Sequence, residues 1–218
     1  MPSRSPPRQG PVALFLIGFV TFALLYAVQP LLPAFAREFR ISAAGSALAL
    51  SLSTGLLALS ILGSSMVARH IDRRQLMLGA ILLATLLNGL SAVCTDWWQV
   101  LVCRALMGAC LGVVPATAMA YLGDTVEAAR LAKTMGLYVA GTAMGGMSGR
   151  VGIAVMADLF GWRVGLFSMS ALCLLAAAGI ALMILNKGTQ PAHPQPSPPA
   201  PLAPWRDVLH HPTLPKLF

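Results

Sequence analysis

Charged residues are scarce in this sequence. They make up 10% of the 218 residues, and only seven of them are Asp or Glu, whereas a typical soluble domain has roughly 25% charged residues. Hydrophobic residues make up 57% of the chain, and the mean hydropathy is +0.75. This composition excludes an ordinary soluble domain. It predicts an all-α membrane protein whose first partner is the lipid bilayer.

Residue patterns for metal binding and disulfide bonds are also missing. Four cysteines lie in or beside apolar runs, without paired or metal-ligand spacing. They are Cys94, Cys103, Cys110 and Cys173. The sequence therefore predicts buried thiols, with no disulfide, no metal site and no cofactor.

Residues 146–149, Gly-Met-Ser-Gly, have the G-x-S-G form of rhomboid-type intramembrane serine proteases. Such a protease needs a general base within hydrogen-bond reach of its serine. All histidines lie outside the apolar runs, at His70, His193, His210 and His211. We therefore expect no enzyme of this kind.

Six apolar runs are long enough to cross a hydrocarbon core, which needs about 20 helical residues. The predicted helices cover 12–34, 46–68, 76–95, 98–122, a stretch that contains 136–150 and ends near 160, and 164–185. Lys and Arg concentrate in the two tails and in the loops after the second and fourth helices, which places both termini in the cytoplasm. The net charge of +8 is thus attributed to membrane topology, and nucleic acid is not an expected partner.

Composition divides the chain into an amino-terminal tail at 1–11, a six-helix bundle at 12–185 and a linker at 186–218, with seven prolines between 188 and 204. Pro30 is the nineteenth residue of the first predicted helix, and Pro115 is the eighteenth of the fourth. This match predicts two inverted three-helix repeats, an arrangement found in many transport proteins.

Arg104 is the strongest single signal for function. An arginine near the middle of a membrane helix costs about 2.5–3.5 kcal/mol on insertion scales, so it should face a polar cavity or a partner. No Asp or Glu lies inside the six apolar runs. The candidate partners are Tyr26, Gln29, Asn88, backbone carbonyls or an anionic substrate. The alternative is that the side chain extends to the membrane interface near Trp98.

A row of glycines precedes a second arginine. Gly141, Gly145 and Gly149 are spaced by four residues, which places them on one helix face where another helix can approach closely. Arg150 follows at once. Three roles stay open for it: contact with a ligand, a clamp at the outer end of the helix, and an indirect pairing with Asp158.

Three motifs carry a resemblance to a known family. Arg104-Ala-Leu-Met-Gly108 followed by Gly112 matches an R-x-x-x-G pattern, and residues 141–149 are similar to a G-x-x-x-G-P-x-x-G-G motif in which Gly146 replaces the proline. Residues 65–74 keep the basic end of a G-x-L-a-D-r-x-G-r-r loop but have Arg69 in place of its aspartate. The sequence resembles the amino-terminal half of a major facilitator superfamily transporter, in particular the bacterial drug-proton antiporter and sugar-efflux type.

The resemblance implies half of a twelve-helix fold, with the substrate site between two six-helix halves. It implies proton coupling through Arg104, close packing through the glycines of both motifs, and a cytoplasmic gating loop at Asp72, Arg73 and Arg74, with the aspartate shifted to Asp72. We expect a truncated or split transporter of the bacterial inner membrane that exports a small solute by alternating access, with protons as a second partner. The alternative is a non-transporting six-helix protein that self-associates through its glycine face.

Overall fold

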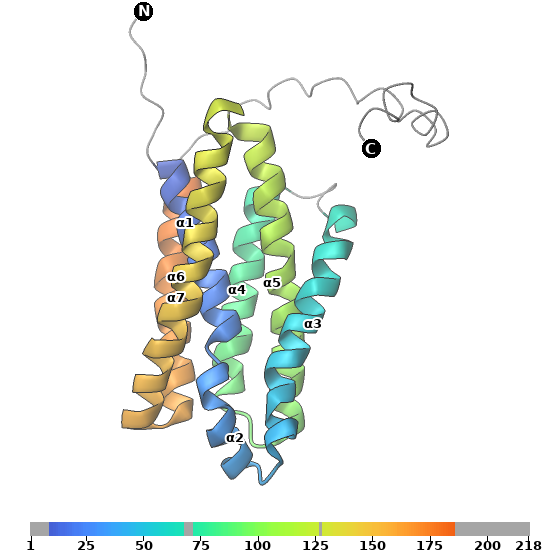
Figure 1. Cartoon of the computed structure of the whole chain (residues 1–218), viewed down its shortest axis with the longest axis vertical. Helices are drawn as coiled ribbons and strands as arrows, with labels where there is room; N and C mark the ends of the chain where they lie inside the picture. The colour runs from blue at the N-terminus through green and yellow to red at the C-terminus, as the bar shows by residue number, and fades with distance from the viewer. Residues whose placement is uncertain (1–8, 68–71, 127, 186–218) are drawn as a thin grey trace, which may run out of the picture. The chain divides into compact units, whose positions relative to one another are not determined.

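A computed structural model describes residues 9–67, 72–126 and 128–185, and its described elements are helices (Figure 1). The helices are α1 Gln9–Tyr26, the short 3-10 helix η1 Gln29–Leu31, α2 Leu32–Glu38, α3 Ala43–Val67, α4 Arg73–Ser91, α5 Trp97–Thr125, α6 Ala128–Phe160 and α7 Trp162–Leu185. The predicted linker at 186–218 and Arg69 lie outside the described residues.

Two prolines interrupt the first predicted helix. Proline lacks an N–H group, and its ring clashes with the carbonyl four residues earlier. Tyr26, the last residue of α1, is four residues before Pro30, and Pro33 begins the first turn of α2. Pro115, by contrast, lies within the continuous helix α5. The two prolines therefore have different local structures, and the inverted-repeat prediction gains no support from them.

Aromatic side chains bring three chain segments together at one end of the bundle. The ring of Phe35 in α2 lies 5.6 Å from that of Trp97 and 5.1 Å from that of Trp162, between ring centroids. The Arg163 guanidinium at the same end pairs with Glu38 at 2.7 Å. We call this end, defined by Phe35, Trp97 and Trp162, the aromatic end; it is the lower end in Figure 1.

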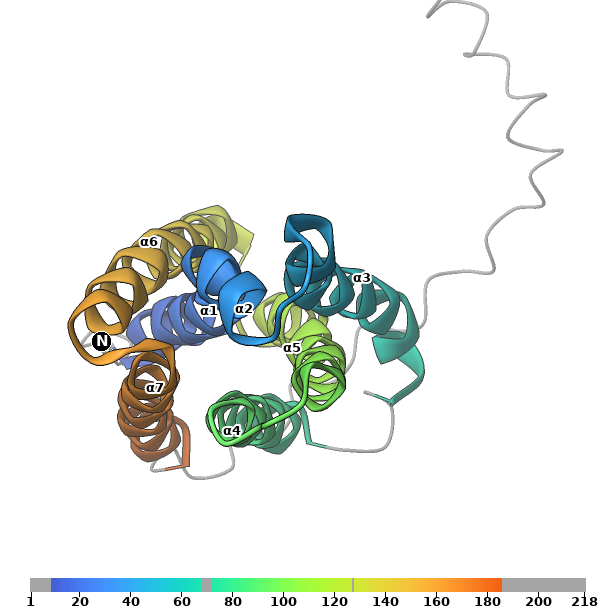
Figure 2. The same ribbon diagram turned by 90° about the horizontal axis from the view of Figure 1, so that it is seen from below.

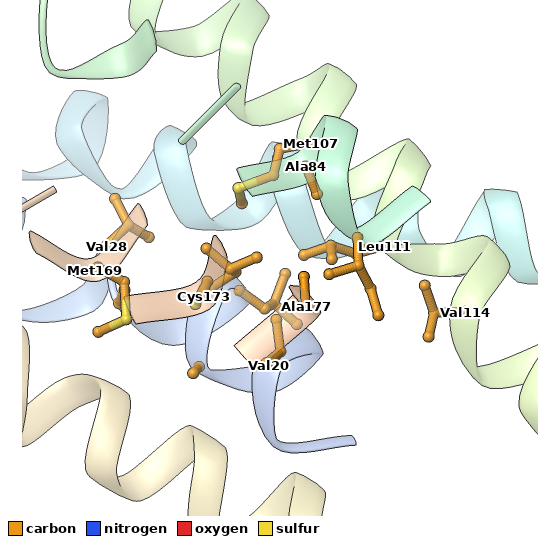
Figure 3. Close-up of a cluster of buried hydrophobic side chains, with 14 of the residues drawn as sticks. Val20, Val28, Ala84, Met107, Leu111, Val114, Met169, Cys173 and Ala177 are labelled. Atoms are coloured by element: carbon orange, nitrogen blue, oxygen red, sulfur yellow. The ribbon is translucent and has the colours of Figure 1, made fainter. Parts of the chain in front are cut away.

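The core lies between α1, α4, α5 and α7. The buried stripe of α5 repeats every three or four residues, and Met107, Leu111 and Val114 are fully buried in it. Figure 3 shows part of this core, with labelled side chains from all four helices. Helices α6 and α3 pack outside it, α6 against α1 and α7, and α3 against α5 (Figure 2).

Among the residues that the structure describes, five helical stretches are long and apolar enough to cross a membrane. They are Pro11–Glu38, Ala43–Ser64, Arg73–Ser91, Trp97–Gly123 and Trp162–Met183. The sequence predicts six spans, and one of the six runs is less apolar than these five. That run is α6, whose glycines and four charged residues lower its hydropathy although its 33 residues give ample length.

Candidate functional site

Arg104 is fully buried in the bundle. Its relative exposure is 0%, which makes it the largest fully buried side chain of the described residues. The residue lies seven positions after Trp97, roughly 10 Å along α5 from the aromatic end. The side chain therefore does not extend to the interface near Trp98. Of the two surroundings expected for this side chain, a polar cavity or a partner, the structure shows a partner inside the bundle.

Asn88 of α4 is the main partner of Arg104. Its side-chain oxygen accepts a hydrogen bond from Arg104 Nη2 at 3.1 Å. Its amide nitrogen donates to the Leu166 carbonyl at 3.1 Å and to Ser170 Oγ at 2.8 Å, both in α7. One asparagine thus connects the arginine of α5 with the backbone and a side chain of α7.

Arg104 has little else to balance its charge. Arg104 Nη1 lies 3.7 Å from the sulfur of Met107, and Nε is buried without a hydrogen-bond partner. Among the side chains that the structure describes, no carboxylate lies within ion-pairing distance of this guanidinium. A buried charge held by one amide oxygen is costly, because most of its lost hydration is not replaced.

Helix α3 holds the backbone of the same residue. Ser53 Oγ shares its hydrogen between the Ala49 carbonyl of α3 at 2.8 Å and the Arg104 carbonyl at 3.0 Å. About two turns further along α3, Ser60 Oγ donates to the Ala109 carbonyl at 2.6 Å. A Cβ atom on Gly108 would overlap the Ser53 backbone, and one on Gly112 would overlap the Leu57 carbonyl. The two glycines of the R-x-x-x-G motif therefore allow α3 to pack directly against α5.

Arg150 forms a second polar cluster, at the surface of the bundle. Arg150 Nε donates to the side-chain oxygen of Gln29 at 2.7 Å, and the guanidinium carbon lies 4.2 Å from the centre of the Tyr26 ring. Gln29 is exposed, and Arg150 and Tyr26 are half-buried. We call Arg150, Gln29 and Tyr26 the surface arginine cluster.

The surface arginine cluster contains two residues that the sequence offers as candidate partners of Arg104. The structure places both Tyr26 and Gln29 against Arg150 instead. Asp158 makes no direct ion pair with Arg150 among the described residues, and the indirect pairing stays a prediction. Arg150 lies ten residues before Phe160, roughly 15 Å along α6 from the aromatic end.

The glycine row of α6 packs against α1. A Cβ atom on Gly145 would lie 2.6 Å from Phe19 Cα, one on Gly149 would lie 2.8 Å from Ala23 Cα, and one on Gly141 would overlap the Phe15 backbone. Close approach of a helix, predicted from the spacing, is thus present. The partner is α1 of the same bundle, so this glycine face is not available for self-association.

The predicted gating loop contains the start of α4. Asp72 is the N-cap, and its side-chain oxygen accepts a hydrogen bond from the backbone N–H of Arg74 at 2.9 Å. Arg73 and Arg74 belong to the first helical turn, and the Arg74 guanidinium carbon lies 5.5 Å from the centre of the Tyr121 ring. Asp72 therefore has a local structural role, which is independent of any gating.

Sequence reasoning missed Ser53 and Ser170 as members of the Arg104 site. Serines are common in membrane helices, where they bond to carbonyls of their own helix, so neither residue stood out. The separate apolar hollow of about 190 Å³ between α1, α6 and α7 is lined by neither arginine. Because neither arginine lines this hollow, we do not treat the hollow as the main candidate site.

Comparison with known proteins identifies the family. A family model for the Major Facilitator Superfamily matches residues 14–218. The chain is 41% identical over 166 residues to the inner membrane transport protein YnfM of Escherichia coli, and 36% identical over 165 residues to the uncharacterized MFS-type transporter YybF of Bacillus subtilis. Each alignment covers 76% of this chain and 40–41% of the relative.

The fold has a counterpart among solved structures. A crystal structure of the peptide transporter POT, an E310Q mutant in complex with sulfate, matches with a TM-score of 0.75 at 15% identity. The match covers 99% of this chain and 46% of the transporter. The chain thus spans less than half the length of the proteins it matches. These sequence and fold matches, together with the helical membrane bundle, show that the chain belongs to the Major Facilitator Superfamily.

Proposed function

We propose that this chain supplies one six-helix half of a proton-coupled exporter of the bacterial inner membrane, with both termini in the cytoplasm. In this arrangement α6 also crosses the membrane, as the fifth of six spans, the six spans form two inverted three-helix repeats, and residues 186–218 form the linker to a second half. The family membership supports membrane transport of a small solute, and the lengths of the relatives support the need for a second half.

One observation supports the proposal of proton coupling. It is the buried charge of Arg104. This guanidinium is fully enclosed, and Asn88 is its polar side-chain partner among the described residues. A carboxylate brought close to Arg104 would form a strong ion pair with it and would therefore lose its proton more readily. A conformational change that brings a carboxylate to Arg104 would thus couple protonation of that carboxylate to the state of the transporter. Arg104 thereby acts on transport through helix arrangement, whereas the substrate path follows the surface of the bundle.

Transport by alternating access would proceed by rocking of the two halves around a central site. The close contacts of α1 with α6 and of α3 with α5 support movement of each helix pair as one unit, since glycine-mediated contacts leave no space for sliding within a pair. A shift of these pairs relative to one another would give a carboxylate access to Arg104. The gating role proposed for Asp72, Arg73 and Arg74 would then act at the cytoplasmic end of α4.

The test uses the protein expressed from its complete gene in inverted membrane vesicles. Glucose, ethidium and benzoate serve as a neutral, a cationic and an anionic probe, and a pH-sensitive dye reports proton movement. We expect at least one probe to drive proton movement in the wild type. Arg104→Ala should reduce that movement about tenfold or more, while Arg37→Gln, which removes an exposed arginine of α2, should leave it unchanged.

Unchanged proton movement in Arg104→Ala would refute the coupling role. If the wild type moves none of the probes but forms stable dimers in detergent, the non-transporting alternative would replace this proposal. The glycine face of α6 would not be the dimer contact in that case, because α1 already covers it.

A further inference from the structure

Arg150 carries a charge at a place where the bundle offers no counter-charge. In the described ranges no carboxylate lies within ion-pairing distance of it. Arginines in membrane segments almost always face a bundle interior or a water-filled cavity, because contact with lipid is costly. Arg150 is half-buried at the surface and its neighbour Gln29 is exposed, so this face of α1 and α6 should border an aqueous cavity.

The guanidinium is held in one orientation by two contacts. Gln29 binds Nε at 2.7 Å, and the Tyr26 ring lies under the guanidinium carbon at 4.2 Å. Nη1 and Nη2 have no acceptor among the described residues. An arginine fixed at Nε, with its two terminal nitrogens available, is suited to bind a carboxylate through two parallel hydrogen bonds.

The surroundings of the cluster favour a single negative charge next to an apolar group. The Phe22 ring lies 6.0 Å from the Tyr26 ring, between centroids. One arginine balances one carboxylate, whereas a phosphate group carries about −1.5 to −2 charge and attracts several cations. Aromatic side chains offer apolar surface for the remainder of the ligand.

Gly146 has no side chain, and the surface arginine cluster occupies the space beside it. A Cβ atom at this position would lie 3.3 Å from Tyr26 Cδ2 and 4.0 Å from Arg150 Nη1. An alanine would therefore crowd the Tyr26 ring without removing any functional group. This residue gives a second way to disturb the cluster while its charge stays in place.

We propose that the surface arginine cluster binds the carboxylate of a small aromatic or apolar organic acid, which is the transported solute. The inference deepens the proposed transport function and rests on it. Arg150 binds the carboxylate, Gln29 fixes the guanidinium, and Tyr26 with Phe22 contacts the apolar part.

The experiment measures binding of radiolabelled benzoate and of its neutral analogue benzamide to the purified protein, expressed from its complete gene, by equilibrium dialysis at neutral pH. We expect benzoate to bind about 10- to 100-fold more tightly than benzamide, because the hydrogen bonds to Arg150 are charge-assisted. Arg150→Gln should reduce benzoate affinity by a similar factor and leave benzamide binding unchanged. Arg150→Lys should recover only part of the loss, since it restores charge without the planar fork.

Four further variants distinguish a specific effect of the cluster from a general loss of folding. Tyr26→Phe should retain benzoate affinity because the ring remains, and Tyr26→Leu should reduce it about threefold to tenfold. Gly146→Ala should also weaken benzoate binding, and it serves if Arg150→Gln fails to accumulate. Arg37→Gln, an exposed arginine outside the cluster, should bind benzoate like the wild type.

Equal binding of benzoate and benzamide by the wild type, or no binding of benzoate, would overturn the carboxylate assignment. If Arg150→Gln binds benzoate as tightly as the wild type does, the carboxylate assignment would be overturned as well. That result is expected if a carboxylate of another part of the protein pairs with Arg150. Transport of glucose or ethidium in the vesicle assay would leave the proposed exporter function intact in each of these cases.

Discussion

Arg104 and Arg150 are both arginines of apolar helices at similar depths, roughly 10 and 15 Å from the aromatic end, yet their surroundings are opposite. Arg104 is sealed between α3, α4 and α7, with its partner Asn88 committed to three hydrogen bonds. Arg150 lies at the surface beside an exposed glutamine and an aromatic ring. A buried arginine fixes helices to one another, whereas a surface arginine can contact a solute.

A glycine contact accompanies each arginine. Gly108 and Gly112 allow α3 to pack closely next to Arg104, and the glycine row that ends at Gly149 allows α1 to pack closely next to Arg150. Backbone contact at these places fixes the helices from which the functional side chains project. The difference between the two arginines therefore comes from the side chains around them, because the local helix packing is similar.

Asn88→Leu should have the largest effect on stability. It removes the oxygen that binds Arg104 and the two hydrogen bonds to α7, which leaves a buried charge without its polar partner. We expect the free energy of unfolding to fall by about 3–5 kcal/mol. Gln29→Leu is the matched change in the surface arginine cluster and should cost less than about 1 kcal/mol.

Unfolding in mixed micelles can be followed with a thiol-reactive dye. Cys103 and Cys173 are buried, and burial raises the pKa of the Cys94 thiol, in the connection between α4 and α5, to about 11. The folded protein thus holds Cys94 in its unreactive protonated form. Equal losses for Asn88→Leu and Gln29→Leu would contradict the distinction between a sealed and an open arginine.

Gly145→Ala should have the next largest effect. The new methyl group would overlap the backbone of Phe19, so α1 and α6 must move apart to accommodate it. We expect a loss of about 1–3 kcal/mol in the same assay. Gly152→Ala adds a methyl group to the same helix where no atom lies within 4 Å, and it should be neutral or stabilising by up to about 1 kcal/mol. Similar losses in both variants would argue against a close α1–α6 contact.

Ser53→Ala should have the smallest of the three effects. It removes the hydrogen bond from α3 to the Arg104 carbonyl while leaving the guanidinium and Asn88 in place. Hydrogen bonds between membrane helices are worth about 0.6 kcal/mol on average, and we expect a loss of that order. Ser51→Ala, an exposed position two residues earlier, should change the free energy of unfolding by no more than about 0.5 kcal/mol. A loss in Ser51→Ala as large as that in Ser53→Ala would show that the hydrogen bond across the helices contributes nothing.

The helices and their approximate ends were predictable, because apolar length and proline chemistry act locally. Errors occurred where a local rule had an exception. The predicted helix at 12–34 is interrupted after Tyr26 and continues as η1, which contains Pro30, and α2, and the helix around the glycine row begins as early as Ala128. The same glycines that permit close packing made α6 less apolar than a typical membrane span.

The pairing of polar side chains was only partly predictable. Asn88 is one of five candidate partners that the sequence offers for Arg104, and two of the others, Gln29 and Tyr26, contact Arg150 instead. Sequence spacing gives the depth of a side chain and its face on a helix. It does not give the helix that the face meets, and Asn88 is 78 residues from Leu166 in the chain.

The sequence by itself determined that this protein lies in the membrane, where its long helices fall, and that two arginines occupy them at similar depths. Only the tertiary structure decided that Arg104 is enclosed and Arg150 accessible, and that α1 fills the glycine row of α6. The physical reason is that hydropathy and helix periodicity depend on neighbours in the chain, whereas enclosure depends on which helices pack together.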